Sequence, residues 1–308
     1  MIPSTPLANQ TTPAIETLAV AMPDTMPDTL AGLRAEIDFI DDAMHDLLMR
    51  RAEVVARVGT LRTVGKVPFR PGREADIIRR LLARHSGSLP RRTLARLWRE
   101  IYAAFISIET PFAIAACDAS GNGDFAAAAR EHFGALTRLR VYRSPAQAIA
   151  DISSGAATAA VLPMPVEEEA PQAAWWTALL HRDEPRIHVV ARLPFWASPR
   201  PDGAVAVQAL VVAAAAPDAS RADRSLLGFE LPPDFSRARL SSVMATAGLA
   251  PNAILIRRTP HGPAAYCLVD VEGHVADGDP RLAALAQAVV APVVVLGGYA
   301  VPVEGDRP

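Results

Sequence analysis

The sequence has few cysteines, no excess of basic residues and no long apolar run, and each shortage excludes a class of protein. Its two cysteines, Cys117 and Cys267, lie far apart without a CxxC or Cys/His pattern, so we expect neither a disulfide nor a zinc site. The formal net charge of -2 lacks the basic excess that binding to a nucleic-acid backbone needs. Even the apolar stretch from Val205 to Ala216 is too short to cross a membrane. We therefore expect neither a nucleic-acid nor a membrane partner.

The first 27 residues contain neither Lys nor Arg and are rich in Pro and Thr. They lack the charged start of a secretory signal peptide. We therefore predict a disordered N-terminus over residues 1–27 and a cytoplasmic location. The remaining length is enough for two or three domains of ordinary size.

A helical block follows this segment. From Leu30 to about Thr63 the apolar residues recur every three or four positions, which predicts one long helix with Asp28 or Thr29 as its N-cap. At about 1.5 Å per residue this helix extends roughly 50 Å, which is more than a compact single-chain domain of this size needs. Such a helix needs a partner. Two shorter helices are predicted at about 73–85 and 91–108.

Three arginines stand on the long helix at intervals close to whole numbers of turns. Arg34, Arg51 and Arg62 are 17 and 11 residues apart, so they can lie near one face that otherwise carries apolar residues. Guanidinium groups in that setting call for an anion. Arginines on a helix more often just face solvent, however, and spacing does not decide between the two interpretations.

The order of residues adds a family resemblance. The segment LAGLRAEIDFIDDAMHDLLMRRAEVVARVGTLRTVGKVPFRPGREADIIRRL, followed by LARLWREIYAAFISIE, resembles the all-α chorismate mutase family over residues 28–110. The resemblance implies that three helices from each of two subunits interlock as a homodimer. It also implies that chorismate rearranges to prephenate there without a cofactor, a metal or a covalent intermediate.

The resemblance assigns the substrate-binding residues. Arg34 matches the arginine that reaches into the other subunit's site, and Arg51 matches the one that holds a substrate carboxylate within its own. Arg73 and Glu74 match the pair that opens the second helix, whose glutamate accepts a hydrogen bond from the ring hydroxyl. Charge-assisted forks from arginine fix the geometry of a dicarboxylate as well as its charge.

The catalytic residues implied by the family are Arg62 and Glu109. A pericyclic rearrangement offers no proton to abstract, so a protein can help only by holding the folded conformer and by stabilising charge on the breaking C–O bond. Arg62 stands where the family usually has a lysine facing the ether oxygen, and Glu109 matches a donor to the same oxygen, which requires its protonated form. If Glu109 instead pairs with a cation, its role is only structural. Phe105 replaces a small residue that lines the family's pocket.

The second half reads as an α/β lobe over 111–197 and, after a linker, a βαββαβ unit over 205–304. These parts resemble the dehydratase and ACT domains of bifunctional chorismate mutase–prephenate dehydratases. The family's Thr-Arg-Phe falls opposite Val207, Gln208 and Ala209, and about one lobe is missing between Trp196 and Ala204, so we expect dehydratase activity to be lost.

The phenylalanine-sensing motifs of the ACT domain are also altered. The glycine of one motif falls at Arg237, and the other motif reads Arg257, Arg258, Thr259 and Pro260. We therefore expect an ACT-like unit that dimerises without sensing phenylalanine.

The fold class expected for the whole chain is multidomain, with an all-α chorismate mutase of three helices, an α/β lobe and a βαββαβ ACT-like domain. Two rival functions stay open beside chorismate mutase. One is a catalytically silent protein that binds chorismate or prephenate and regulates a partner, and the other is a bifunctional enzyme with residual dehydratase activity. The seven histidines show no HExxH or HxH spacing, so core or surface histidines are expected.

Overall fold

The computed structural model describes residues 29–61, 69–197, 207–258, 262–287, 289–290 and 292–305. The chain divides into two compact units, Met1–Thr60 and Leu61–Pro308, and each is described by itself. Within these described ranges, no helix combines the length and the apolar character that a membrane crossing requires. The predicted disordered segment 1–27 lies outside the described residues.

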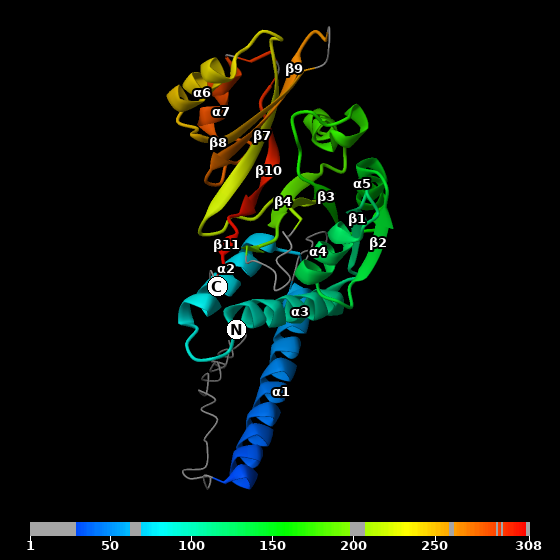
Figure 1. Ribbon diagram of the computed structural model, residues 1–308, viewed down its shortest axis with the longest axis vertical. Coiled ribbons are helices and arrows are strands. Elements are labelled where there is room, and N and C mark those ends of the chain that lie inside the picture. Colours follow the sequence, from blue (N-terminus) through cyan, green and yellow to red (C-terminus); the bar gives the residue numbers. More distant parts are fainter. Residues whose placement is uncertain are drawn as a thin grey trace, which may run out of the picture. The chain divides into compact units, whose positions relative to one another are not determined.

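The described part of the first unit consists of Thr29 and the helix α1, Leu30–Leu61, whose last residue is the first of the second unit (Figure 1). The backbone N–H of Gly32 donates to the hydroxyl of Thr29 at 3.1 Å, so Thr29 is the N-cap. The predicted long helix is confirmed. We define the α1 seam as the positions that repeat at intervals of three and four residues, which are Leu30, Leu33, Ile37, Ile40, Met44, Leu47, Arg51, Val54, Val58 and Leu61.

The α1 seam is exposed within this chain. Its nine apolar side chains are 41–84% exposed, and Gly32 is the buried residue of the helix. An alternation of three and four residues is the pattern of helices that pack against another helix along their length. The seam therefore has the form of a contact surface.

The helices α2, Pro71–Arg84, and α3, Arg91–Glu109, belong to the second unit. Ile78 and Leu82 of α2 share an apolar cluster with Tyr102 of α3, and Phe195 and Ala300 from the sheet region join the same cluster. Both helices therefore bury an apolar face against neighbours in their own chain, as their 3.6-residue periodicity predicts.

A mixed sheet is the scaffold of the second unit. Within the described ranges, nine strands pair in the order β2-β1-β3-β6-β4-β10-β7-β9-β8. The first five in this order are β2 (Arg138–Tyr142), β1 (Ala113–Cys117), β3 (Ala159–Pro163), β6 (Ala209–Ala213) and β4 (His188–Leu193). The strands β2, β1 and β3 are parallel, whereas β6 runs antiparallel to both β3 and β4.

Two helices cover opposite faces of the parallel strands, because successive side chains of a strand point to opposite sides. Ile114 and Ala116 pack with α4 (Asp124–Phe133), while Ala115 and Cys117 pack with α5 (Pro145–Ser153). Cys117 and Cys267 are buried in separate clusters.

The other strands form the predicted βαββαβ order. The elements are β7 (Asp223–Leu231), α6 (Arg237–Thr246), β8 (Pro251–Arg258), β9 (Ala265–Glu272), α7 (Pro280–Ala286) and β10 (Val294–Ala300). The strands pair antiparallel in the order β10-β7-β9-β8, and α6 and α7 lie together on one side of them (Figure 1).

The lobe and the βαββαβ unit share one sheet, which differs from the predicted division at residues 197 and 205. The strand β6, expected in the second segment, pairs with strands of the first, and β10 pairs with β4 at Gly297 and Val189. Gly297 has a φ of +134°, and a Cβ there would lie 2.1 Å from the carbonyl oxygen of Val189. Only glycine permits this approach of the two strands.

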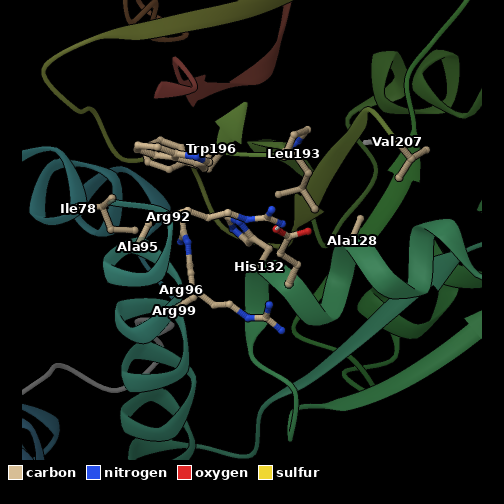
Figure 2. Close-up of a pocket in the computed structure, with 13 residues that line it drawn as sticks. Ile78, Arg92, Ala95, Arg96, Arg99, Ala128, His132, Leu193, Trp196 and Val207 are labelled. Carbon is tan, nitrogen blue, oxygen red and sulfur yellow. Dashed lines mark hydrogen bonds and ion pairs between the residues drawn. The ribbon is translucent and has the colours of Figure 1, made fainter. Parts of the chain in front are cut away.

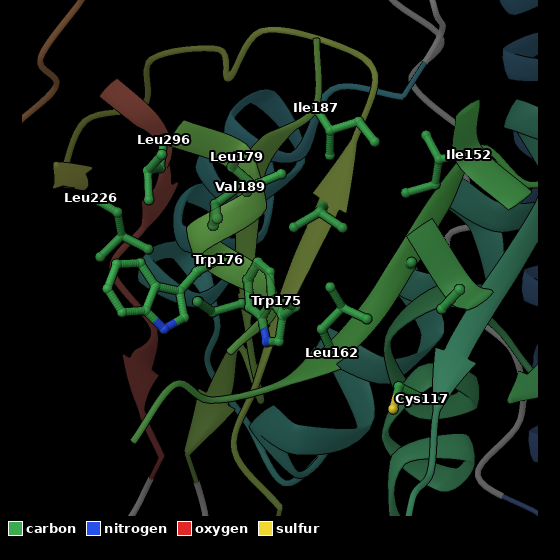
Figure 3. Close-up of a cluster of buried hydrophobic side chains, with 14 of the residues drawn as sticks. Cys117, Ile152, Leu162, Trp175, Trp176, Leu179, Ile187, Val189, Leu226 and Leu296 are labelled. Atoms are coloured by element: carbon green, nitrogen blue, oxygen red, sulfur yellow. The ribbon is translucent and has the colours of Figure 1, made fainter. Parts of the chain in front are cut away.

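The shared core contains two indoles. Trp175 and Trp176 pack with Leu162, Leu226 and Leu296, which come from both halves of the sheet (Figure 3). The short elements here are 3-10 helices, η1 (Pro171–Ala173) and η2 (Trp175–His181). The Nε1 atoms of Trp175 and Trp176 donate to the oxygens of Pro163 and Glu169, which fixes the tighter turn. The last described pairing joins β11 (Val303–Glu304) to β5 (Trp196–Ala197).

Candidate functional site

The arginines predicted on the long helix differ in their position on it. Arg51 occupies one of the ten positions of the α1 seam and is half-buried, whereas Arg34 flanks the seam and is exposed. A long cation in an otherwise apolar contact surface is costly unless an anion meets it. Arg62 lies outside the described residues.

The start of α2 is held by a carboxylate from the β6–β7 connection. Asp218 accepts hydrogen bonds from the backbone N–H groups of Gly72 at 2.9 Å and Arg73 at 3.0 Å, and Arg70 lies 3.5 Å from its Oδ2. A carboxylate at this end of a helix meets unpaired N–H groups and the positive end of the dipole. A Cβ at position 72 would lie 2.3 Å from the carbonyl oxygen of Asp218, so glycine permits the contact. The side chain of Arg73 is exposed.

Glu74 has a partner within its own chain. Its Oε2 accepts a hydrogen bond from Nη1 of Arg99 at 3.0 Å, and the two side chains are only 12% and 8% exposed. Burial raises the pKa of Glu74 to about 7, although the guanidinium of Arg99 opposes the shift. Burial likewise lowers the pKa of Arg99, because desolvation disfavours both charged forms.

Arg99 is the buried partner of Glu74 that sequence analysis missed. It stands on the buried face of α3 with Ala95, Tyr102 and Ile106, and its guanidinium lies 5.1 Å from the ring centroid of Phe195. A charged residue at an apolar position of an amphipathic helix was the signal that could have found it, because such a charge is rarely buried without a partner.

The residues predicted near the end of α3 lie on its last two turns. Phe105 is buried and Glu109 is half-buried. Arg73, Glu74, Phe105 and Glu109 therefore belong to the second unit, whereas Arg34 and Arg51 belong to the first. The assembly of these residues into one site stays a prediction.

Several residues that fall opposite the dehydratase and ACT motifs make contacts within the second unit. Gln208 accepts a hydrogen bond from Arg192 at 3.4 Å, and Ala209 opens β6. Arg237 forms a two-pronged ion pair with Glu167 at 2.7 and 2.9 Å. Arg258 donates to the carbonyl oxygen of Phe235 at 2.8 Å. Thr259 and Pro260 lie outside the described residues.

No group of three or more His, Cys, Asp or Glu in the described part is placed to hold a metal ion. The positive charge near the start of α2 and on α3 comes from arginine side chains such as Arg70, Arg73 and Arg99. The candidate residues of the second unit are thus guanidinium and carboxyl groups on α2 and α3, which suit the binding and orientation of a ligand.

The class of the helical segment follows from comparison with known families. Residues 33–110 match the family described as chorismate mutase type II. The chain is also similar to two proteins named bifunctional chorismate mutase/prephenate dehydratase. That of Stutzerimonas stutzeri is 29% identical over 143 residues, covering 44% of this chain and 39% of the relative. That of Pseudomonas aeruginosa is 31% identical over 144 residues, again 44% and 39%.

The chain therefore spans about two fifths of the length of these curated relatives. Among solved structures, a prephenate dehydratase from Streptococcus mutans is 18% identical, with a TM-score of 0.44 and coverage of 62% of this chain and 98% of that chain.

Proposed function

We propose that the chain is a chorismate mutase that rearranges chorismate to prephenate in the cytoplasm, on the branch that leads to phenylalanine and tyrosine. The observation that carries this proposal is the family match over residues 33–110, which includes Arg34, Arg51, Arg73, Glu74 and Glu109. Chorismate carries two carboxylates, and arginine forks suit them.

The proposed chemistry needs no cofactor. Arg34 and Arg51 hold the substrate carboxylates and favour the folded conformer, which removes much of the entropic barrier. Arg62 and Glu109 act at the ether oxygen, where negative charge grows only in the transition state, so their interaction with it is differential. Glu74 keeps acceptor capacity for the ring hydroxyl, because only its Oε2 is engaged by Arg99.

We further propose that the chain works as a homodimer in which α1 packs against the partner's helices and Arg34 completes the partner's site. The exposed α1 seam supports this arrangement, since nine apolar side chains at a three-four repeat gain from burial against another helix. Arg51 within the seam then reaches substrate at the same contact surface.

The second half is proposed to be a remnant without dehydratase activity. Val207, Gln208 and Ala209 offer neither the hydroxyl nor the charge that the dehydratase motif supplies. The βαββαβ unit is proposed to be an ACT-like tail that pairs with its twin but does not sense phenylalanine. The ion pair of Arg237 with Glu167 supports this assignment, since it occupies the position of a ligand-binding glycine.

The test is to supply the purified chain with chorismate and to follow both the loss of its absorbance and the acid-independent appearance of phenylpyruvate. We expect loss of chorismate without phenylpyruvate. Arg51→Gln should lower kcat/KM by about 100-fold or more, because it removes a charge-assisted contact to the substrate. The matched control, Arg50→Gln, changes the adjacent arginine outside the seam and should retain activity.

Each other outcome of this assay has a defined meaning. Chorismate binding without turnover, measured by calorimetry, would replace the proposal by the silent binding protein. Phenylpyruvate formed without acid would contradict the loss of dehydratase activity.

A further inference from the structure

A small cavity lies in the second unit between α3, α4 and the segment Leu193–Trp196 (Figure 2). Its volume is about 50 Å³, which is room for roughly three or four water-sized groups. The polar side chains that line it are Arg92, Arg96, Arg99, Glu131, His132 and Trp196. These residues are separate from the predicted chorismate-binding set, although Arg99 also contacts Glu74.

The cavity carries an excess of positive charge. Arg92, Arg96 and Arg99 stand at intervals of four and three residues, so they share one face of α3. Arg92 pairs with Glu131 at 3.2 Å and Arg99 pairs with Glu74. Arg96 is exposed and forms no ion pair with any residue that the structure describes. The site can therefore accept one further negative charge.

Two buried ring nitrogens at the cavity also lack a hydrogen-bond partner in the described part of the chain. Within the described part of the chain, the Nε1 atom of Trp196 and the Nε2 atom of His132 are buried and have no hydrogen-bond partner. An indole N–H can only donate, and an unsatisfied buried donor costs about 1–3 kcal/mol. His132 is 8% exposed and its ring packs edge-on against Phe133 at 4.7 Å, which holds its orientation.

The imidazole of His132 can supply a second donor without carrying charge. Burial, and next the positive charge of Arg99, lower its pKa well below 6.5, so the ring is neutral at physiological pH. The neutral ring can carry its proton on Nε2. The two ring nitrogens and the exposed guanidinium of Arg96 all line this cavity and are groups that an oxyanion can bind.

We infer that this cavity binds a small organic carboxylate, with Arg96 as its ionic partner and the ring N–H groups of Trp196 and His132 as donors to its oxygens. The rest of the lining is mainly apolar and includes Ile78, Ala95 and Leu193, so the body of the ligand is a short hydrocarbon. An inorganic phosphate is a poorer fit, because apolar walls do not replace the hydration of its remaining oxygens.

The test uses the full chain labelled with 15N at tryptophan and is independent of mutase activity. Propionate should shift the indole N–H signal of Trp196 downfield in a saturable manner, and Trp196→Phe identifies that signal by removing it. Propionamide has the same shape without the charge and should bind at least about tenfold more weakly. The Trp196 signal isolates this cavity from the arginines of α1.

Two variants test the ionic partner. Arg96→Gln should weaken propionate binding by about tenfold, because it removes one charge-assisted contact. Arg80→Gln changes an exposed arginine of α2 that does not line the cavity, and it should leave binding unchanged. Unaltered signals from the other three tryptophans report that each variant is folded.

Three results would overturn the inference. They are an unshifted Trp196 signal at saturating propionate, equal binding of propionate and propionamide, and tighter binding of inorganic phosphate than of propionate.

Discussion

The helices α1 and α3 both lie in the segment that matches the chorismate mutase family, yet they treat their apolar residues in opposite ways. α3 buries Tyr102, Phe105 and Ile106 within its own unit. α1 leaves its apolar seam exposed, with side chains such as Ile37 at 57% and Met44 at 54%. Both helices carry apolar residues at helical spacing, but only α3 covers them within the described chain.

This difference teaches that one family segment serves two kinds of contact. The apolar face of α3 packs against α2, α4 and the strand region of the same chain. This packing places Arg99 beside Glu74. The α1 seam is exposed, and Arg51 stands in it. Since exposed apolar area of this extent rarely stays uncovered, the predictions below begin with the seam.

The largest effect is expected from a charge placed in the seam. Ile40→Asp puts a carboxylate where the proposed contact is apolar, and burying it unpaired costs several kcal/mol in each subunit. We expect the mass of the oligomer to halve in analytical ultracentrifugation and mutase activity to be lost.

The matched control for the seam is Ala56→Asp, which places the same carboxylate at an exposed α1 position outside the seam. Its oligomer should keep the wild-type mass. If Ile40→Asp sediments like the wild type, the α1 seam does not hold the subunits together, and the proposed dimer through α1 is wrong.

The second prediction tests whether Arg34 acts across subunits. Arg34→Ala and Arg51→Ala should each be nearly inactive as separate proteins. When the two are co-expressed with different tags, half of the dimers are mixed, and each mixed dimer has one site with both arginines intact. Activity should then recover to about a quarter of the wild-type value. If Arg34 serves its own subunit, every site in a mixed dimer lacks one arginine, and no activity returns.

Much of the fold could be predicted from the sequence because it depends on local patterns. The repeat in α1, the apolar faces of α2 and α3, and the βαββαβ order are all visible in the spacing of apolar residues. The pairing of β6 with β3 and β4 could not be predicted, because β6 is an apolar run with no feature that selects its neighbours. Strand pairing over long separations depends on the whole sheet rather than on local spacing.

The candidate site was predicted in its residue types but not in all its contacts. Arg73 and Glu74 could be named from the order of residues, and their helix is confirmed. Asp218, which binds the start of that helix, lies about 145 residues away in the chain, and no local pattern links the two segments. The ion pair of Glu74 with Arg99 was missed for a related reason, since Arg99 belongs to a different helix whose docking the sequence does not specify.

The smallest predicted effect concerns α3. The buried pair of Glu74 and Arg99 should make the free energy of unfolding depend on pH. Burial raises the pKa of Glu74 from 4.5 to about 7 in the folded chain. Between these values the folded chain holds a proton that the unfolded chain has released, so the free energy of unfolding falls as the pH rises. Glu74→Gln removes this dependence and can still accept the hydrogen bond from Arg99 through its amide oxygen.

The measurement is urea denaturation followed by tryptophan fluorescence at about pH 5 and about pH 8. From about pH 5 to about pH 8, the free energy of unfolding should fall by roughly 2–3 kcal/mol more in the wild type than in Glu74→Gln. Glu168→Gln, which changes an exposed carboxylate, should behave like the wild type. An identical pH dependence in the wild type and Glu74→Gln would mean that Arg99 compensates fully for the burial of the carboxylate. The pair would then be a permanently charged anchor of α2 to α3, and the pKa of Glu74 would not lie near 7.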